Sequence, residues 1–200
     1  MKATQALSLT TLIVLSAAAN AASIIVDETD LGFTDHGPGA MAVDNGGVHF
    51  DGSALSSLVV LMNAPDAYVS WTFTGLDSAK TYDVAATWSN IDSWPQNNLN
   101  TGAHYTIIGD STVMEALNHS VPANADYVEQ DSSMVSHNFE TIGQVKPKND
   151  GTIVLELRDT DANGILGVVA DAALVNAVPE PSSGLLAGLG AVTMLLLRRK

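Results

Sequence analysis

The 200-residue sequence contains no cysteine. This absence excludes disulfides, thiolate metal sites, thiol nucleophiles and dithiol redox motifs. Basic residues are also scarce, because eight lysines and arginines stand against 22 acidic residues, for a formal net charge of −14. Between Ser23 and Val178 the basic residues are only Lys80, Lys146, Lys148 and Arg158. Such a chain repels phosphate backbones, so we expect no binding to nucleic acid.

Recognisable catalytic patterns are missing as well. The five histidines include no HExxH pair, no serine lies in a GxSxG elbow, and there is no glycine-rich phosphate loop. Carboxylates are plentiful, and a pair of them drives glycoside hydrolysis when geometry allows. Asp83 in a predicted strand and Asp92 in a predicted loop are possible members of such a pair. We expect a protein that is not an enzyme, with a secreted glycan-active hydrolase or lyase as the alternative.

The third absence is that of amphipathic helices between Ser23 and Val178. Alternating apolar residues instead predict short strands, separated by clusters of Gly, Asn, Asp and Pro. In Ala67–Phe73 the apolar positions are Ala67, Val69, Trp71 and Phe73, and a similar alternation follows at Thr81–Trp88. The polar turn between these two runs predicts a β-hairpin.

Further strands are predicted in six stretches: 57–62, 103–108, 111–117, 139–145, 151–157 and 165–175. Only at 111–118 does a short helix compete with a strand. Nine or ten short strands without helical crossovers indicate an all-β fold, an antiparallel jelly-roll-like β-sandwich. Asp171 falls inside the apolar stretch 165–175, so we expect a buried carboxylate that accepts hydrogen bonds from backbone N–H groups.

The N-terminus has the pattern of a secretory signal peptide. Lys2 precedes an apolar stretch from Leu7 to Leu15, and Ala19-Asn20-Ala21 fits a small-residue cleavage site. We predict a signal helix in residues 1–22, export of the chain, and a mature β-sandwich domain over 23–177. A membrane anchor at this end is the alternative.

The C-terminus, residues 178–200, has three parts in a fixed order. Pro179, Glu180 and Pro181 come first, an apolar segment over 183–197 follows, and Arg198, Arg199 and Lys200 end the chain. As a helix, the 14 residues Gly184–Leu197 would be about 21 Å long, whereas the hydrocarbon core of a bilayer is about 30 Å thick. We therefore predict a short transmembrane helix that holds the chain only transiently, with its basic end in the cytoplasm. A permanent single-pass anchor is the alternative.

This tripartite end resembles the PEP-CTERM sorting signal of Gram-negative bacteria. The resemblance implies that an exosortase, a membrane-bound processing protease, recognises Pro-Glu-Pro. It also implies that the tail is removed and that the body is delivered to the cell surface or to the extracellular polysaccharide matrix.

Aromatic residues make up 6% of the chain, and one of them lies in its longest unpatterned stretch, Asn90–Gly102. Long loops on compact domains often carry function. Sugar rings pack against aromatic faces while amides and carboxylates bind the hydroxyls. The loop supplies both kinds of group, so the candidate ligand-binding residues are Asp92, Trp94, Gln96, Asn97 and Asn98, with Trp88 at the end of the preceding strand.

The segment "DTDANG" (Asp159–Gly164) matches the first half of a calcium-binding EF-hand loop, with oxygens at alternate positions. The match then fails, because Ala170 stands where a bidentate Glu is needed. A hairpin turn through Asn163-Gly164 is the competing interpretation. If calcium is a cofactor, Asp159, Asp161 and Asn163 are its predicted ligands; otherwise we expect no cofactor.

A second resemblance covers about 110 residues of the body. Trp71/Phe73, Tyr82/Val84/Trp88 and the closing run Val168–Ala172 resemble the golvesin-type domain, which also occurs at the C-terminal ends of some secreted polysaccharide lyases. Phe139 and Lys80 depart from that family's pattern. The resemblance implies a carbohydrate-binding or adhesive β-sandwich. We therefore expect an exported, non-catalytic surface or matrix protein that binds or organises polysaccharide, for example in a biofilm, with a purely structural matrix protein as a further alternative.

Overall fold

The structure is a computed structural model of the whole chain. It describes residues 22–37, 40–44, 50, 57–62, 67–88, 101–132, 134–159 and 167–179, with the backbone alone for 40–44 and 57–62. Residues Ala22–Val178 form one compact unit. The description below concerns this body.

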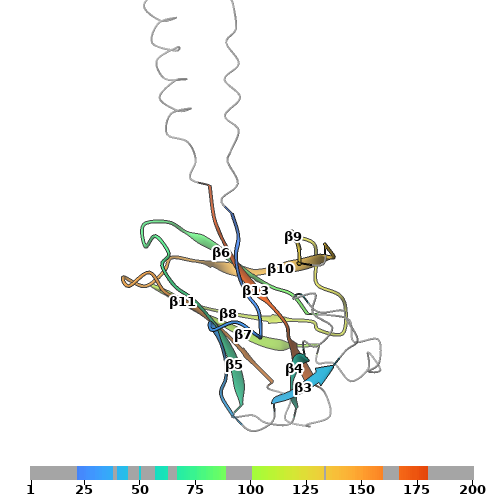
Figure 1. Ribbon diagram of the computed structural model, residues 1–200. Coiled ribbons are helices and arrows are strands. Elements are labelled where there is room, and N and C mark those ends of the chain that lie inside the picture. Colours follow the sequence, from blue (N-terminus) through green and yellow to red (C-terminus); the bar gives the residue numbers. More distant parts are fainter. Residues whose placement is uncertain are drawn as a thin grey trace, which may run out of the picture. The chain divides into compact units, whose positions relative to one another are not determined.

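Two five-stranded antiparallel sheets make up most of the body (Figure 1). The first has the order β1-β13-β6-β10-β9. Its strands are β1 (Ile24–Val26), β13 (Ala173–Ala177), β6 (Tyr82–Ala86), β10 (Ser136–Val145) and β9 (Tyr127–Gln130). The first described strand thus pairs with the last described strand.

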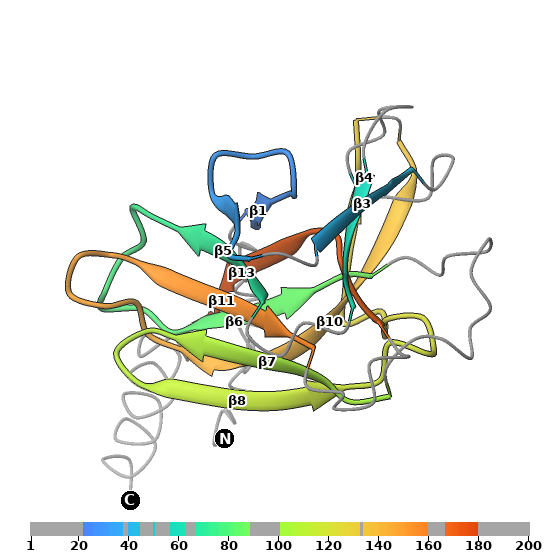
Figure 2. The same ribbon diagram turned by 90° about the horizontal axis from the view of Figure 1, so that it is seen from below.

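The second sheet has the order β2-β5-β11-β7-β8, and Figure 2 shows β5, β11, β7 and β8 side by side. Its strands are β2 (Phe33–Asp35), β5 (Tyr68–Phe73), β11 (Ile153–Arg158), β7 (Ala103–Ile108) and β8 (Thr112–Leu117). A smaller third sheet has the order β12-β4-β3, with β12 at Gly167–Ala170, β4 at Ser57–Met62 and β3 at Ala40–Asp44.

The core lies between the inner faces of the two large sheets. Alternation along each strand directs every second side chain inward, as in β11, where Ile153, Leu155 and Leu157 are fully buried and the residues between them are not. Among the described residues, the largest fully buried side chains are those of Trp71, Phe73, Tyr105, Ile107, Phe139, Ile153, Leu155, Leu157 and Leu174. The predicted all-β antiparallel sandwich is confirmed.

The hairpin predicted between Ala67–Phe73 and Thr81–Trp88 is wrong. The alternation itself is confirmed, since Trp71 of β5 and Val84 of β6 are both buried in the core. However, β5 pairs with β2 and β11, whereas β6 pairs with β10 and β13. The two strands therefore belong to different sheets, and the segment between them crosses from one sheet to the other.

The single strand predicted over 165–175 is also divided. β12 pairs with β4 in the small sheet, and β13 pairs with β1 and β6 in the first large sheet. Asp171 lies between these two strands, not inside one. The described residues contain thirteen strands, whereas nine or ten are predicted. The difference arises because predicted strands are divided in this way and because three-residue strands are too short to show alternation.

The competition between strand and helix at 111–118 is resolved as strand β8. Within the described part of the chain there is no helix, and in particular none long and apolar enough to cross a membrane. The predicted signal helix and the predicted transmembrane helix over 183–197 lie outside the described residues.

Candidate functional site

Three acidic side chains from distant parts of the sequence gather in the body. Asp27 and Glu28 follow β1, and Asp171 precedes β13, which pairs with β1 through Val26 and Ala173. One oxygen atom of each carboxyl group lies within 4.8 Å of the other two. Asp27 and Asp171 are buried and Glu28 is half-buried. We call Asp27, Glu28 and Asp171 the acidic cluster.

Burial raises the pKa of Glu28 to about 10, helped by the neighbouring carboxyl groups of Asp27 and Asp171. Glu28 is therefore protonated at neutral pH. Its two carboxyl oxygens are buried, and no N–H or O–H group among the described residues donates to them. Chemically, such a cluster can hold a shared proton or a hard divalent cation, since either relieves the repulsion between carboxylates.

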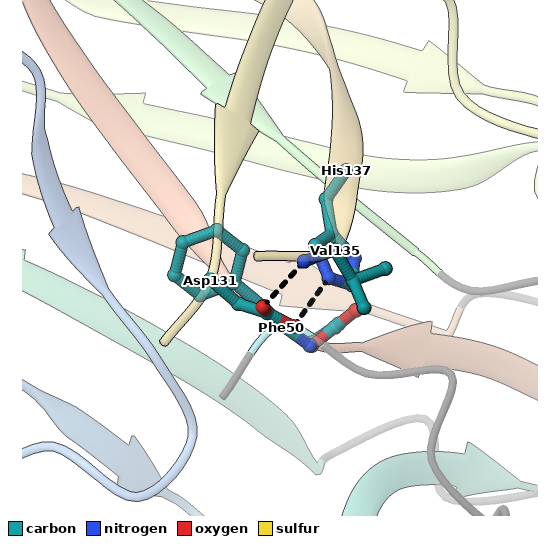
Figure 3. Close-up of polar contacts among 5 residues, drawn as sticks. Phe50, Asp131, Val135 and His137 are labelled. Carbon is teal, nitrogen blue, oxygen red and sulfur yellow. Dashed lines mark hydrogen bonds and ion pairs between the residues drawn. The ribbon is translucent and has the colours of Figure 1, made fainter. Parts of the chain in front are cut away.

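Phe50 connects the acidic cluster to a second buried polar pair. Its backbone N–H donates to Asp171 Oδ1 at 3.1 Å, which confirms that Asp171 is a buried carboxylate with a backbone donor. Its ring lies edge-on against His137, with the ring centroids 5.3 Å apart. His137 Nε2 lies 3.0 Å from Asp131 Oδ2, and the Val135 N–H donates to the other oxygen of Asp131 at 2.9 Å (Figure 3). These contacts fix the turn between β9 and β10.

Trp88 lies where the predicted ligand-binding loop begins, and it is only 3% exposed. Its ring stacks on His119, with the centroids 4.4 Å apart, and its Nε1–H donates to the Val121 carbonyl at 2.7 Å. Ala103, just after the loop, is fully buried. The structure therefore gives Trp88 a packing role against His119.

The tautomer of His119 follows from its contacts. Nδ1 accepts a hydrogen bond from the Val169 N–H at 3.1 Å, so the proton lies on Nε2 and is donated to the Tyr105 hydroxyl oxygen at 3.0 Å. Burial lowers the pKa of His119 to about 3. Burial, and next the charges of Glu140 and Asp171, hold the pKa of Tyr105 well above its usual value. This Trp88–His119–Tyr105 group is neutral at physiological pH and enclosed in the core.

Most of the predicted site residues lie outside the described part of the chain. This holds for Asp92, Trp94, Gln96, Asn97 and Asn98 of the loop, for Asp161 and Asn163 of the predicted calcium site, and for Glu180, Pro181, Arg198, Arg199 and Lys200 of the tail. Asp159, the remaining predicted calcium ligand, is buried, and Pro179 is exposed. These assignments stay predictions.

Asp83, a candidate catalytic carboxylate, lies on β6 and accepts hydrogen bonds from the Tyr127 hydroxyl and, at 2.7 Å, from Gln144 Nε2. Sequence analysis missed Asp27 and Glu28. The acidic run "DETD" directly after the first strand was the available signal, but its partner, Asp171, is more than 140 residues away.

Comparison with known proteins identifies the chain's end. Residues 177–200 match the family model of the PEP-CTERM protein-sorting motif. This confirms the resemblance at the C-terminus, and the motif implies an exported protein. A comparison with curated proteins gave no match.

Solved structures that are similar to the body include two from carbohydrate-related proteins. The first is the xanthan lyase of Paenibacillus, with a TM-score of 0.57, 19% identity, and coverage of 78% of this chain but only 13% of the lyase. The second is a CBM35 from Cellvibrio japonicus, with a TM-score of 0.46, 18% identity, and coverage of 78% of this chain and 97% of that one. The chain thus corresponds in fold to a small part of the lyase. The sorting motif and the fold together describe an exported protein with a β-sandwich body.

Proposed function

We propose that this protein is an exported, non-catalytic component of the cell surface or extracellular matrix that binds or organises polysaccharide. The observation that carries the proposal is the sorting motif at residues 177–200, which follows a β-sandwich body. The motif implies processing by an exosortase, so the body acts outside the cell. The inner membrane holds it only until the tail is removed.

Two further observations support a polysaccharide as the partner. The body shares its fold with part of a xanthan lyase, whose name identifies a polysaccharide as the substrate of that enzyme. The predicted loop, with its tryptophan, amides and carboxylate, has the composition of a sugar-binding segment.

Glycan binding by the exported protein is the first test. On a glycan array we expect the wild type to bind, and Trp94→Ala to bind at least tenfold more weakly, equivalent to about 1.4 kcal/mol, because the aromatic face is lost. Trp94→Phe keeps an aromatic face and serves as the matched control. Release of reducing sugar from the same glycans would support the hydrolase alternative, and unsaturated products would support a lyase. If there were neither binding nor product, the structural alternative would stand.

Processing of the tail is the second test. We expect mass spectrometry of the surface-exposed protein to find the chain without Arg198, Arg199 and Lys200. Replacing Pro179, Glu180 and Pro181 with alanine should leave the tail attached and the protein in the inner membrane, because the recognition sequence is gone. An intact Lys200 on the wild-type surface protein would contradict exosortase processing.

A further inference from the structure

A row of four side chains crosses the outer face of the sheet that contains β5 and β11. Tyr68 of β5 lies opposite Arg158 of β11, which lies opposite His104 of β7. On the other side of β5, the backbone N–H of His36 donates to the backbone carbonyl of Tyr68 at 2.9 Å. The core residues Val69 and Leu157 are the sequence neighbours of Tyr68 and Arg158, so by strand alternation this row faces away from the core.

A second row runs beside the first. Ser70 of β5 lies opposite Glu156 of β11, which lies opposite Thr106 of β7. Residues two apart on a strand share a face, so Ser70 and Glu156 belong to the same surface as Tyr68 and Arg158. The outer strip is defined here as His36, Tyr68, His104, Glu156 and Arg158, all of them at least partly exposed. Ser70 is only 5% exposed, so it can hold His36 in place but offers little surface to a ligand.

Contacts within the outer strip hold its side chains in place. The rings of His36 and Tyr68 stack with centroids 4.2 Å apart and planes 11° from parallel, and the Arg158 guanidinium carbon lies 4.0 Å from the Tyr68 ring centroid. Arg158 Nη2 donates to Glu156 Oε2 at 3.0 Å, and His36 Nε2 lies 2.8 Å from Ser70 Oγ. Side chains ordered before binding lose little conformational entropy when a ligand arrives.

The geometry points to the outer strip as a contact surface for an uncharged polysaccharide chain. This inference rests on the proposed function and assigns the sugar to described residues instead of those of the predicted loop. The guanidinium offers several N–H donors, the carboxylate accepts, and hydroxyl and imidazole groups do either. Together they suit the neighbouring hydroxyl groups of a sugar, which both donate and accept.

The repeat of the sheet supports the same ligand class. Neighbouring strands are about 4.8 Å apart, which is close to the length of one pyranose ring in an extended glycan. A glycan that lies across β2, β5, β11 and β7 therefore meets a new polar side chain of the row at each sugar.

The negative charge of the protein argues against acidic polysaccharides as ligands of the outer strip. Arg158 and Glu156 form an ion pair and neutralise each other, and the chain as a whole carries −14. A polyanion such as an acidic polysaccharide is repelled by such a protein. An uncharged glycan is not, and its binding should change little with salt concentration.

The test uses affinity gel electrophoresis of the exported protein through neutral polysaccharides, with alginate as the acidic comparison, at low and high salt. We expect retardation by a neutral polysaccharide at both salt concentrations. Arg158→Gln and Tyr68→Ala should each weaken it about tenfold. Lys146→Gln removes the same charge from an exposed position elsewhere and should bind like the wild type. Thermal unfolding of each variant checks that it is folded. If Tyr68→Ala is not folded, Tyr68→Phe, which keeps the ring and removes the hydroxyl group, takes its place.

Each alternative result has a distinct meaning. If Trp94→Ala abolishes binding while Arg158→Gln and Tyr68→Ala bind like the wild type, the outer strip is overturned and the proposed function stands. Stronger, salt-sensitive retardation by alginate overturns the uncharged class of ligand. Absence of retardation in every polysaccharide overturns the outer strip and the proposed function together.

Discussion

Acidification from pH 7 to pH 4 is expected to lower the free energy of unfolding by about 3 kcal/mol through His119 alone. In the folded protein this imidazole is enclosed by Trp88, Tyr105 and the Val169 N–H, and burial lowers its pKa to about 3. In the unfolded chain it takes up a proton near pH 6.5. Between these two values the unfolded state binds one more proton than the folded state. The contribution of neutral His119 to the free energy of unfolding is therefore fully present above pH 6.5. It is lost as the pH falls towards 3, at up to about 1.4 kcal/mol per pH unit.

Urea unfolding followed by tryptophan fluorescence at several pH values measures this loss. His119→Asn keeps an acceptor near the Val169 N–H and removes the titration. It should be less stable at pH 7, because its stacking with Trp88 is gone, but should lose about 3 kcal/mol less than the wild type between pH 7 and pH 4. His104→Asn, at an exposed histidine on β7, is the matched control and should keep the full loss. Equal acid losses in wild type and His119→Asn would contradict the assignment.

Local patterns were enough to predict which residues of the strands face inward. Trp71 and Phe73 in β5, and Tyr82 and Val84 in β6, are all buried as the alternation indicates. Alternation depends on neighbours two residues apart, and the sequence contains these directly. It does not indicate which strands pair, which is why β5 and β6 were assigned to one hairpin although they belong to opposite sheets.

Long-range pairing explains the missed site. The acidic cluster exists because β1 pairs with β13, bringing Asp27 and Glu28 to Asp171. No local pattern reports a pairing between the two ends of the body. His119 is a similar case, since its partners Trp88, Tyr105 and Val169 come from three separate segments. By contrast, the sorting motif is read from consecutive residues, so sequence alone was enough to predict it.

The acidic cluster should make the protein less stable at alkaline pH. The pKa of Glu28 is raised from 4.5 to about 10 in the folded state, so above pH 4.5 the folded protein holds a proton that the unfolded chain releases. The stability linked to this proton is complete below pH 4.5 and is lost as the pH rises towards 10. If the folded state held one more proton than the unfolded state over three whole pH units, the free energy of unfolding would fall by about 4 kcal/mol. Because Glu28 is only partly buried, hydration and screening reduce the expected loss between pH 6 and pH 9 to about 1 to 2 kcal/mol.

Glu28→Gln preserves the shape of the side chain and cannot titrate, so its stability should change less than that of the wild type between pH 6 and pH 9. Glu115→Gln, at an exposed glutamate on β8, is the matched control and should behave like the wild type.

Repeating the pH titration with calcium and with a chelator tells apart the two occupants that the acidic cluster could hold, a proton and a cation. A cation that replaced the proton would remove the alkaline loss in the wild type, but it would have little effect on Glu28→Gln or Asp171→Asn, because each lacks one of the three carboxylates. The same alkaline loss in wild type and Glu28→Gln would show that Glu28 does not hold the proton, since the remaining carboxyl groups would then account for the whole pH dependence.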